Sequence, residues 1–291
     1  MWAEFPRYLP FTERAWKQLR HGAWLVAEWT RQQRRPPVVY VWPDMPSRRA
    51  ALHKIARFLG WELTNRARPS AELGIHFEDA TQKQRSAPPP TLNARRWWNT
   101  HCADIGKQTL EHHHVRAFGY GMGVDPTVHA GPMVVKSDEN AKHDGQIVQG
   151  PILAASQRAD AVYQRVIENT DEAGTYFDYR VVFMQGEFPV VYRKFKDAAK
   201  RFSNETVNVD LLETMPFSES ELHAMRSLAN LMSIDYAEFD ALRDRTSGKL
   251  FVVDVNPTPW GPPAQLNAEG QRTAISRMAN CLQSLVQASN K

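Results

Sequence analysis

Two neighbouring stretches near the C-terminal end, residues 236–244 and 249–257, constrain the fold most strongly. Both are rich in aromatic and β-branched residues, and a short polar loop containing one glycine separates them. This composition predicts a β-hairpin. With the loop centred between the strands, Asp240 lies directly opposite Asp254, and strand alternation places Asn256 on the same face as Asp254.

The two facing aspartates need an explanation, because like charges that oppose each other across a hairpin are destabilising, with Cβ atoms roughly 5 Å apart. A divalent cation bound by their oxygens would remove this repulsion. Mg²⁺ in particular takes carboxylate and amide oxygens and completes its shell with waters and phosphates. The pattern therefore predicts a platform for magnesium and a nucleotide. A solvated polar face on an edge hairpin is the alternative.

The composition predicts a soluble protein with a buried hydrophobic core. With 291 residues, of which 42% are hydrophobic and 23% charged, we expect one to three domains. Two cysteines, Cys102 and Cys281, make no disulfide framework, which suits a reducing compartment. The sequence contains no secretory hydrophobic region and no apolar run of about eighteen residues. We therefore expect a cytoplasmic protein that does not associate with membranes.

The net charge of +4 is mildly basic, and no dense Lys/Arg tract stands out, which favours anionic small molecules over nucleic acid as partners. The first 35 residues are rich in Trp and Arg, and apolar residues there have helical spacing at Trp16, Leu19, Ala23 and Val26. A stacking platform for nucleic acid combines such aromatics and cations. Packing in a core or an interface is the more frequent role of Trp at this spacing, so we expect no nucleic-acid partner.

The N-terminal third alternates between strand and helix patterns. We expect strands over residues 38–42 and 73–77 and a helix over 47–59, which together indicate a small α/β unit. It contains no Gly-rich dinucleotide fingerprint. A Pro-rich connector over residues 85–91 suggests a boundary, so the N-terminal α/β domain is assigned to residues 1–103.

The segment after the connector predicts a helix over residues 104–118 that carries three consecutive histidines, 112–114. Successive helical residues point about 100° apart, so the three side chains cannot bind one metal ion. We interpret them as a solvated helix face.

A strand over residues 130–136 ends in Lys136, and a polar loop over 137–145 leads into a second strand over 146–150. Backbone N–H groups in such a loop can bind phosphates while the lysine neutralises them. An ordinary surface hairpin with one exposed lysine is the alternative.

The remaining segments predict a second, largely β unit. Strand patterns cover residues 163–169, 176–184, 188–194 and 207–211. A helix then begins at Ser218 with a capping box, and a last amphipathic helix covers residues 268–286.

In this order, roughly residues 105–265 resemble an ATP-grasp protein, and most closely the RimK-type amino-acid ligases. The matching positions are Asp178-x-Arg180, Arg193, Arg201-x-x-Asn204, Asp240 and Asp254-x-Asn256-x-x-Pro. The resemblance implies an α+β fold with ATP in a cleft between two α+β subdomains, here a small one over 104–168 and a C-terminal one over 169–291.

The resemblance also implies roles for individual residues. Asp240, Asp254 and Asn256 would hold Mg²⁺, for which Mn²⁺ could substitute. The residues that would contact ATP are Lys107 and Lys136 at the phosphates, Asn140, His143 and Gly145 in the loop over the γ-phosphate, and Gln164, Val166 and Ile167 at the adenine. The residues that would face the transferring phosphate and the acceptor carboxylate are Arg180, Arg193, Arg201 and Asn204.

Two departures from the family pattern stand out. The usual bridging Glu is replaced by Asp254, which is one methylene shorter, and this bears on the metal spacing. The loop over residues 140–145 has fewer glycines than in many relatives, and its His143 and Asp144 could instead touch the substrate.

The resemblance implies an ATP-dependent carboxylate–amine ligase that forms an acyl phosphate and releases ADP and phosphate. Its partners would be small-molecule or peptide carboxylates and amines, and a homodimer would be common among relatives. One alternative is an ATP-grasp kinase acting on a sugar or polyol hydroxyl. A second alternative is a non-catalytic module that binds nucleotides or glycans.

Overall fold

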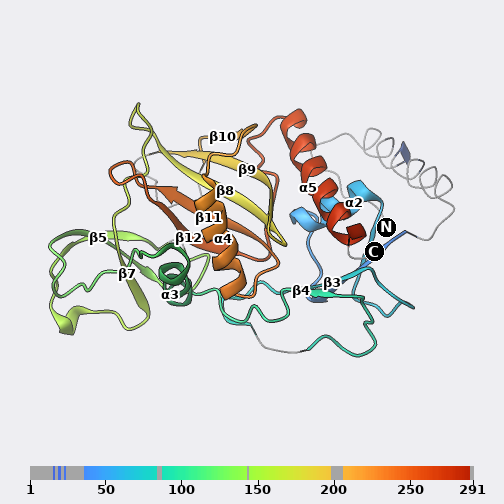
Figure 1. The fold of residues 1–291 in the computed structure, drawn as a ribbon, viewed down its shortest axis with the longest axis horizontal. Coiled ribbons are helices and arrows are strands. Elements are labelled where there is room, and N and C mark those ends of the chain that lie inside the picture. Colours follow the sequence, from blue (N-terminus) through green and yellow to red (C-terminus); the bar gives the residue numbers. More distant parts are fainter. Residues whose placement is uncertain are drawn as a thin grey trace.

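The computed structural model describes residues 36–83, 87–142, 144–197 and 206–288, with positions 16, 19, 20 and 23 before them. In this part of the chain three sheets are flanked by helices (Figure 1). Trp16 and Leu19 are 68% and 67% exposed, so they do not enter the core. Arg20 and Ala23 are exposed too, and the remaining residues of the Trp- and Arg-rich start, including Val26, lie outside the described residues.

The N-terminal unit is a parallel four-stranded sheet in the order β2-β1-β3-β4. Its strands are β1 (Val38–Pro43), β2 (Glu62–Thr64), β3 (Leu73–Phe77) and β4 (Trp97–Trp98). Helix α2 (Ala51–Leu59) connects β1 to β2 and ends at Gly60, whose φ of 70° suits glycine. The two expected strands and the helix are confirmed, although the helix begins four residues later than predicted.

The second sheet is antiparallel, with the order β6-β5-β7. It consists of β5 (Gly131–Ser137), β6 (Gln146–Gly150) and β7 (Ala161–Arg165), preceded in the chain by helix α3 (Lys107–Phe118), with the short 3₁₀ helix η1 (Ala154–Ser156) between β6 and β7. The strand expected over residues 163–169 is shifted toward the N-terminus. It ends at Arg165 because the following residues cross to the third sheet, where the Asn169 amide donates to the Phe177 carbonyl at 2.8 Å.

The third sheet has five antiparallel strands in the order β10-β9-β8-β11-β12. The strands are β8 (Tyr176–Met184), β9 (Glu187–Lys196), β10 (Asn208–Leu211), β11 (Tyr236–Arg243) and β12 (Leu250–Asn256). Helix α4 (Glu219–Leu231) begins with the predicted capping box, in which Ser218 and Glu221 cap each other, and α5 (Ala268–Ala288) follows the sheet.

Strand alternation divides the third sheet between two cores. On β8, Val182 and Met184 join a core with β1, β3, α2 and α5, whereas Val181 and Phe183 join a core with α3 and α4. Figure 1 shows α4 across one face of the sheet and α5 beside α2 at its far end. The first and last segments of the described chain therefore share one hydrophobic core.

The three consecutive histidines on α3 are not a uniform solvated face, so that interpretation is wrong for one of them. His112 is exposed, but His114 is fully buried. Its ring stacks on Phe118 at 4.2 Å between centroids, and its Nε2 accepts a hydrogen bond from the Val252 amide at 3.2 Å. The three side chains diverge as predicted, and His114 anchors α3 to β12.

None of the described helices combines the length and the apolar character that a membrane-spanning helix needs.

Candidate active site

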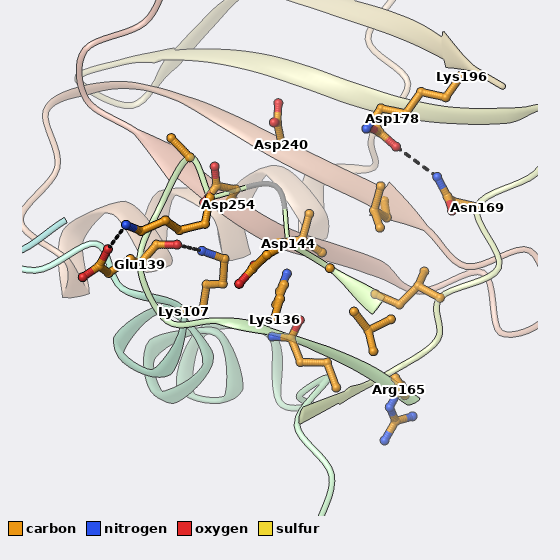
Figure 2. A pocket seen from close by; sticks show the side chains of 18 residues that line it. Lys107, Lys136, Glu139, Asp144, Arg165, Asn169, Asp178, Lys196, Asp240 and Asp254 are labelled. Atoms are coloured by element: carbon orange, nitrogen blue, oxygen red, sulfur yellow. Dashed lines mark hydrogen bonds and ion pairs between the residues drawn. The ribbon is translucent and has the colours of Figure 1, made fainter. Parts of the chain in front are cut away.

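A cavity of about 180 Å³ lies between the second and third sheets (Figure 2). Strands β5 and β7 with the loop after β5 form one side, and β8, β9, β11 and β12 form the other. The predicted site residues that line it are Lys107, Lys136, Gly145, Gln164, Ile167, Asp240 and Asp254. Those that are described but do not line it are Asn140, Val166, Arg180, Arg193 and Asn256. His143, Arg201 and Asn204 lie outside the described residues.

The predicted opposition of Asp240 and Asp254 is confirmed, because the two residues pair directly across β11 and β12. A register irregularity follows at once, between Asp240 and Ala241. Burial and then the negative charge of Asp240 raise the pKa of Asp254 to about 6, although nearby Lys107 and Lys136 oppose the shift. One carboxylate oxygen of Asp254, Oδ1, is buried and has no hydrogen-bond partner among the described residues.

Asp240 is held by Arg180, its neighbour on β8 in the cross-strand register. Arg180 donates from Nε to Oδ1 at 3.0 Å and from Nη2 to Oδ2 at 3.3 Å. Burial opposes ionisation of Asp240, but Arg180 and then Lys194 outweigh it and hold the pKa of this carboxyl well below its usual range. Arg180 thus neutralises Asp240, and both of its hydrogen bonds go to that aspartate rather than to Asp254.

Two lysines approach Asp254 from the opposite side of the cavity, as Figure 2 shows. Lys136 extends from β5, and within the described residues its Nζ has no hydrogen-bond partner; burial lowers its pKa to about 8, while Asp254 opposes this shift. Lys107, the first residue of α3, donates to the Glu139 carbonyl at 2.6 Å and to Asn140 Oδ1 at 3.3 Å. Lys107 therefore fixes the loop, whereas the ammonium group of Lys136 faces the cavity.

The loop between β5 and β6 is fastened at several points. The Asn140 amide donates to the Val255 carbonyl at 3.2 Å, and its backbone N–H donates to Thr81 Oγ1 at 2.9 Å. Asp144 accepts hydrogen bonds from the Ser137 amide, at 3.1 Å, and from the Ser137 hydroxyl. The predicted phosphate loop thus extends along the cavity toward β12. Asn140 is not part of the cavity lining, and its hydrogen bonds connect the loop to Thr81 and to β12.

One part of the cavity wall is apolar. It is formed by Val134, Ile167, Leu242 and Val253, next to the buried Gln164. Such a surface can receive a planar aromatic ring. Val166, which follows the last residue of β7, is not part of the cavity lining.

Arg193 is placed differently from the prediction that it faces the same phosphate as Arg180. It lies opposite Tyr179 in the β8–β9 register, and strand alternation therefore points it to the other face of the sheet from Arg180. There it pairs with Asp210 at 2.8 Å and stacks over Phe195 at 4.9 Å.

Among the charged residues that the sequence patterns did not assign to the site, four lie on strands of the third sheet. Lys196 pairs with Asp178 at 2.6 Å at the cavity wall, Lys194 is buried near Asp240, and Glu238 is buried with Oε2 3.6 Å from Arg180 Nε. Burial raises the pKa of Glu238 to about 7, although Arg180 opposes this. Asp178 and Glu238 lie two residues from Arg180 and Asp240 on the same strands, so strand alternation would have found them. Lys194 and Lys196 lie one and three residues from Arg193, and only the register between β8 and β9 brings them to this face.

The oxygen atoms of the hairpin fit a hard divalent cation. The described residues contain no cluster of three or more His, Cys, Asp or Glu side chains arranged to hold a metal. Asp254 nevertheless offers a buried oxygen without a partner, and each oxygen of Asp240 keeps a lone pair beside its bond to Arg180. Asn256 Oδ1 accepts from the Thr258 backbone N–H at 2.9 Å and from its hydroxyl at 3.0 Å, so it would bind an ion only after releasing Thr258, and the two aspartates provide the fit. Carboxylate and amide oxygens are the donors that Mg²⁺ prefers.

No protein-family model matches this sequence, and no curated protein shows significant similarity to it. Solved structures do match the fold. D-alanine–D-alanine ligase from Bacillus anthracis superimposes with a TM-score of 0.53 at 11% identity, covering 88% of this chain and 100% of that one.

Two structures of the ATP-grasp ligase PsnB superimpose equally well. The complex with precursor peptide PsnA2 and AMPPNP gives a TM-score of 0.52 at 11% identity, over 86% of this chain and 96% of PsnB. The complex with minimal precursor, Mg and ADP gives 0.51 at 10% identity, over 86% and 98%. Likeness at such low identity concerns the backbone fold. This chain has the ATP-grasp fold.

Proposed function

We propose that the protein is an ATP-dependent ligase that joins a carboxylate to an amine. One observation carries this proposal. The cavity between the second and third sheets brings Lys136 from β5 to face Asp254 and Asp240 on the hairpin, which is an arrangement suited to a polyphosphate with its metal.

The lining suggests how ATP would lie. The adenine would contact the apolar wall at Ile167 and Leu242, and Lys136 would neutralise the phosphates. Asp240 and Asp254, with Asn256, would hold Mg²⁺, which would neutralise phosphate charge in this site when bound. The fold neighbours support this arrangement, since PsnB was captured with Mg and ADP and with AMPPNP.

The proposed reaction has two steps. An oxygen of the substrate carboxylate attacks the γ-phosphorus of ATP, and the bond between this phosphorus and the β,γ-bridging oxygen breaks. The products of this step are ADP and an acyl phosphate. The amine nitrogen then attacks the acyl carbon, phosphate departs, and the nitrogen loses a proton to solvent. Neither step requires a protein nucleophile, because positioning and charge neutralisation are the contributions that phosphoryl transfer needs. Arg180, fixed on Asp240, would keep that aspartate ionised throughout.

Three structural units support the proposed division of the chain. The parallel sheet falls within residues 1–103, the β5–β7 sheet within 104–168, and the five-stranded sheet within 169–291. The cavity lies at the junction of the last two, as expected for a nucleotide cleft between subdomains.

Trapping with hydroxylamine tests the proposal without knowledge of the amine. Protein, ATP and Mg²⁺ are incubated with pools of carboxylic acids and hydroxylamine, and the products are identified by mass spectrometry. We expect ADP release that depends on one acid, together with formation of the hydroxamate of that acid. In Asp254→Ala, the rate of ADP release should fall by a factor of at least about 100. Chelation of the metal should stop the reaction, and Mn²⁺ should restore it.

The other outcomes separate the alternatives. A phosphorylated alcohol without any hydroxamate would replace the ligase by a kinase. Nucleotide binding with no ADP release from any acid or alcohol pool would leave a binding module.

A further inference from the structure

Three buried polar atoms on the face of the sheet that carries Arg180 and Asp240 lack a hydrogen-bond partner among the described residues. They are Glu238 Oε2, the Tyr192 hydroxyl and the Tyr236 hydroxyl. The three residues are only 3%, 0% and 1% exposed. An unsatisfied buried polar group is costly, and natural proteins contain few of them, so three near one another require a cause.

The three side chains share one face of the third sheet. Tyr192 on β9 pairs with Arg180 on β8, and Arg180 pairs with Asp240 on β11. Tyr236 and Glu238 precede Asp240 on β11 at intervals of two residues, so all of them point to the same side. After burial, the negative charge of Glu238 is the next cause that raises the pKa of both tyrosines, which places the three groups within electrostatic reach of one another.

The charge of Glu238 is incompletely balanced. Arg180 is its nearest cation at 3.6 Å, but both of the hydrogen bonds that Arg180 makes in this region go to Asp240. One arginine thus stands between the buried carboxylate of Glu238 and the half-buried one of Asp240. A buried carboxylate of this kind favours a cation that can also donate hydrogen bonds.

Free space adjoins the carboxylate. A Cβ placed on Gly261 would lie 3.4 Å from Glu238 Oε1, and apart from adjoining residues no other described atom lies within 4 Å of that point. Gly261 belongs to the loop that follows the hairpin, next to the exposed Trp260. The volume that a side chain would fill at this glycine is therefore open beside the charged group.

We propose that Glu238, Tyr192 and Tyr236 form a subsite for the primary ammonium group of a substrate. Three acceptor oxygens match the three N–H donors of such a group, and the carboxylate supplies the opposite charge. The subsite lies one pair of residues along β11 from Asp240, so a bound amine would sit next to the phosphates. Its role as the amine site of a ligase rests on the proposed function, whereas its affinity for ammonium does not.

Thermal denaturation in three salts tests this subsite directly. Methylammonium, tetramethylammonium and potassium chlorides are compared at equal ionic strength, without nucleotide. We expect methylammonium to raise the melting temperature by about 2 °C or more above the other two. Tetramethylammonium has the same charge but no N–H donor, and potassium tests for a simple alkali-metal site.

Variants assign the effect to these residues. Glu238→Gln should abolish the difference between the salts, and the Tyr192→Phe/Tyr236→Phe double variant should diminish it severalfold; the latter carries the test alone if the former does not fold. Tyr179→Phe is the matched control, since this buried tyrosine lies on the opposite face of the same sheet, in the core with α3 and α4. The control should keep the full difference.

The inference would be overturned by equal shifts in all three salts, by an equal shift with potassium, or by a difference that survives in both variants. Ammonium binding without hydroxamate formation would remove the ligase proposal and leave the subsite. Hydroxamate formation without ammonium binding would remove the subsite and leave the ligase proposal.

Discussion

Asp254 is a carboxylate in a position that favours its neutral form. Burial raises its pKa from 3.8 to about 6, so between these values the folded protein binds more protons than the unfolded chain. The stability that this proton contributes is present below the unfolded pKa and is lost as the pH rises through about 6. Without ligand, the ionised residue therefore destabilises the fold near neutral pH.

We predict that Asp254→Asn is more stable than the wild type at neutral pH and loses this advantage in acid. The amide does not titrate, so the gap in the free energy of unfolding should widen by on the order of 1 to 3 kcal/mol between about pH 4 and pH 7. Urea denaturation at several pH values, without metal, measures it. Glu172→Gln, at an exposed carboxylate, is the control; a gap that narrows with rising pH would contradict the prediction.

Arg180 and Arg193 lie in the same sheet but differ in how deeply they and their carboxylate partners are buried. Arg180 is flanked by Asp240 and Glu238 and its side chain is 22% exposed, whereas the Arg193–Asp210 pair is at the surface, with side chains 37% and 38% exposed.

We predict that Arg180→Met lowers the free energy of unfolding by about 3 kcal/mol, because the buried Glu238 and the half-buried Asp240 lose the cation that pairs with both. Arg193→Met should cost no more than about 1 kcal/mol. Chemical denaturation of both variants measures the contrast, and similar losses for the two would show that Arg180 is not the electrostatic centre of the sheet.

At the scale of elements, the loop between β5 and β6 and the start of α3 hold each other. The side-chain oxygen Oδ1 of Asp138 accepts a hydrogen bond from the backbone N–H of Gln108 at 2.8 Å, and Lys107 Nζ donates to the Glu139 carbonyl. The cavity wall on this side is therefore made of two segments that are distant in sequence.

Lys107→Met should loosen this loop. We predict faster amide hydrogen exchange over residues 137–142 and an ATP affinity lowered by about tenfold, with little change in the five-stranded sheet. Lys142→Met is the matched control for exchange, because Lys142 pairs with Glu139 at 2.7 Å on the surface. Unchanged exchange in Lys107→Met would mean that the loop is held by Asn140 and Asp144 alone.

The elements with long periodic patterns could be predicted from the sequence. Strand β3 and the ends of β8 match the expected ranges, and the facing of Asp240 and Asp254 followed from the length of one loop. Strands β2 and β4, with three and two residues, were missed because so few residues carry no periodicity.

Site residues were harder, because a family motif states positions along the chain and not the faces of strands. The motif includes Arg193, which alternation sends to the far side of the sheet, and it does not include Glu238, which alternation brings to the site. His114 was misjudged for a related reason: only the packing of α3 on β12 shows that a polar side chain is enclosed.

At the scale of the molecule, the N-terminal sheet and the C-terminal helix belong to one core. Leu282 and Met278 of α5 lie in the same cluster as Ile55 of α2 and Ile75 of β3. The described chain therefore cannot lose its last helix without exposing the N-terminal unit.

We predict that Leu282→Ala lowers the free energy of unfolding by about 2 to 5 kcal/mol and that the protein unfolds in one transition. Tryptophan fluorescence, to which Trp97 and Trp98 of the N-terminal unit contribute, should coincide with far-ultraviolet circular dichroism during urea unfolding. Leu153→Ala, at a side chain 78% exposed, should change stability by less than about 0.5 kcal/mol. Two separated transitions would mean that the shared core does not couple the units.

The position of α5 also has a consequence for synthesis on the ribosome. The apolar surfaces of β1, β3 and α2 are translated before the second and third sheets, but the helix that covers them follows those sheets. A nascent chain therefore carries this surface uncovered until α5 has been made, and chaperones that bind exposed apolar segments can act on the N-terminal unit during this interval.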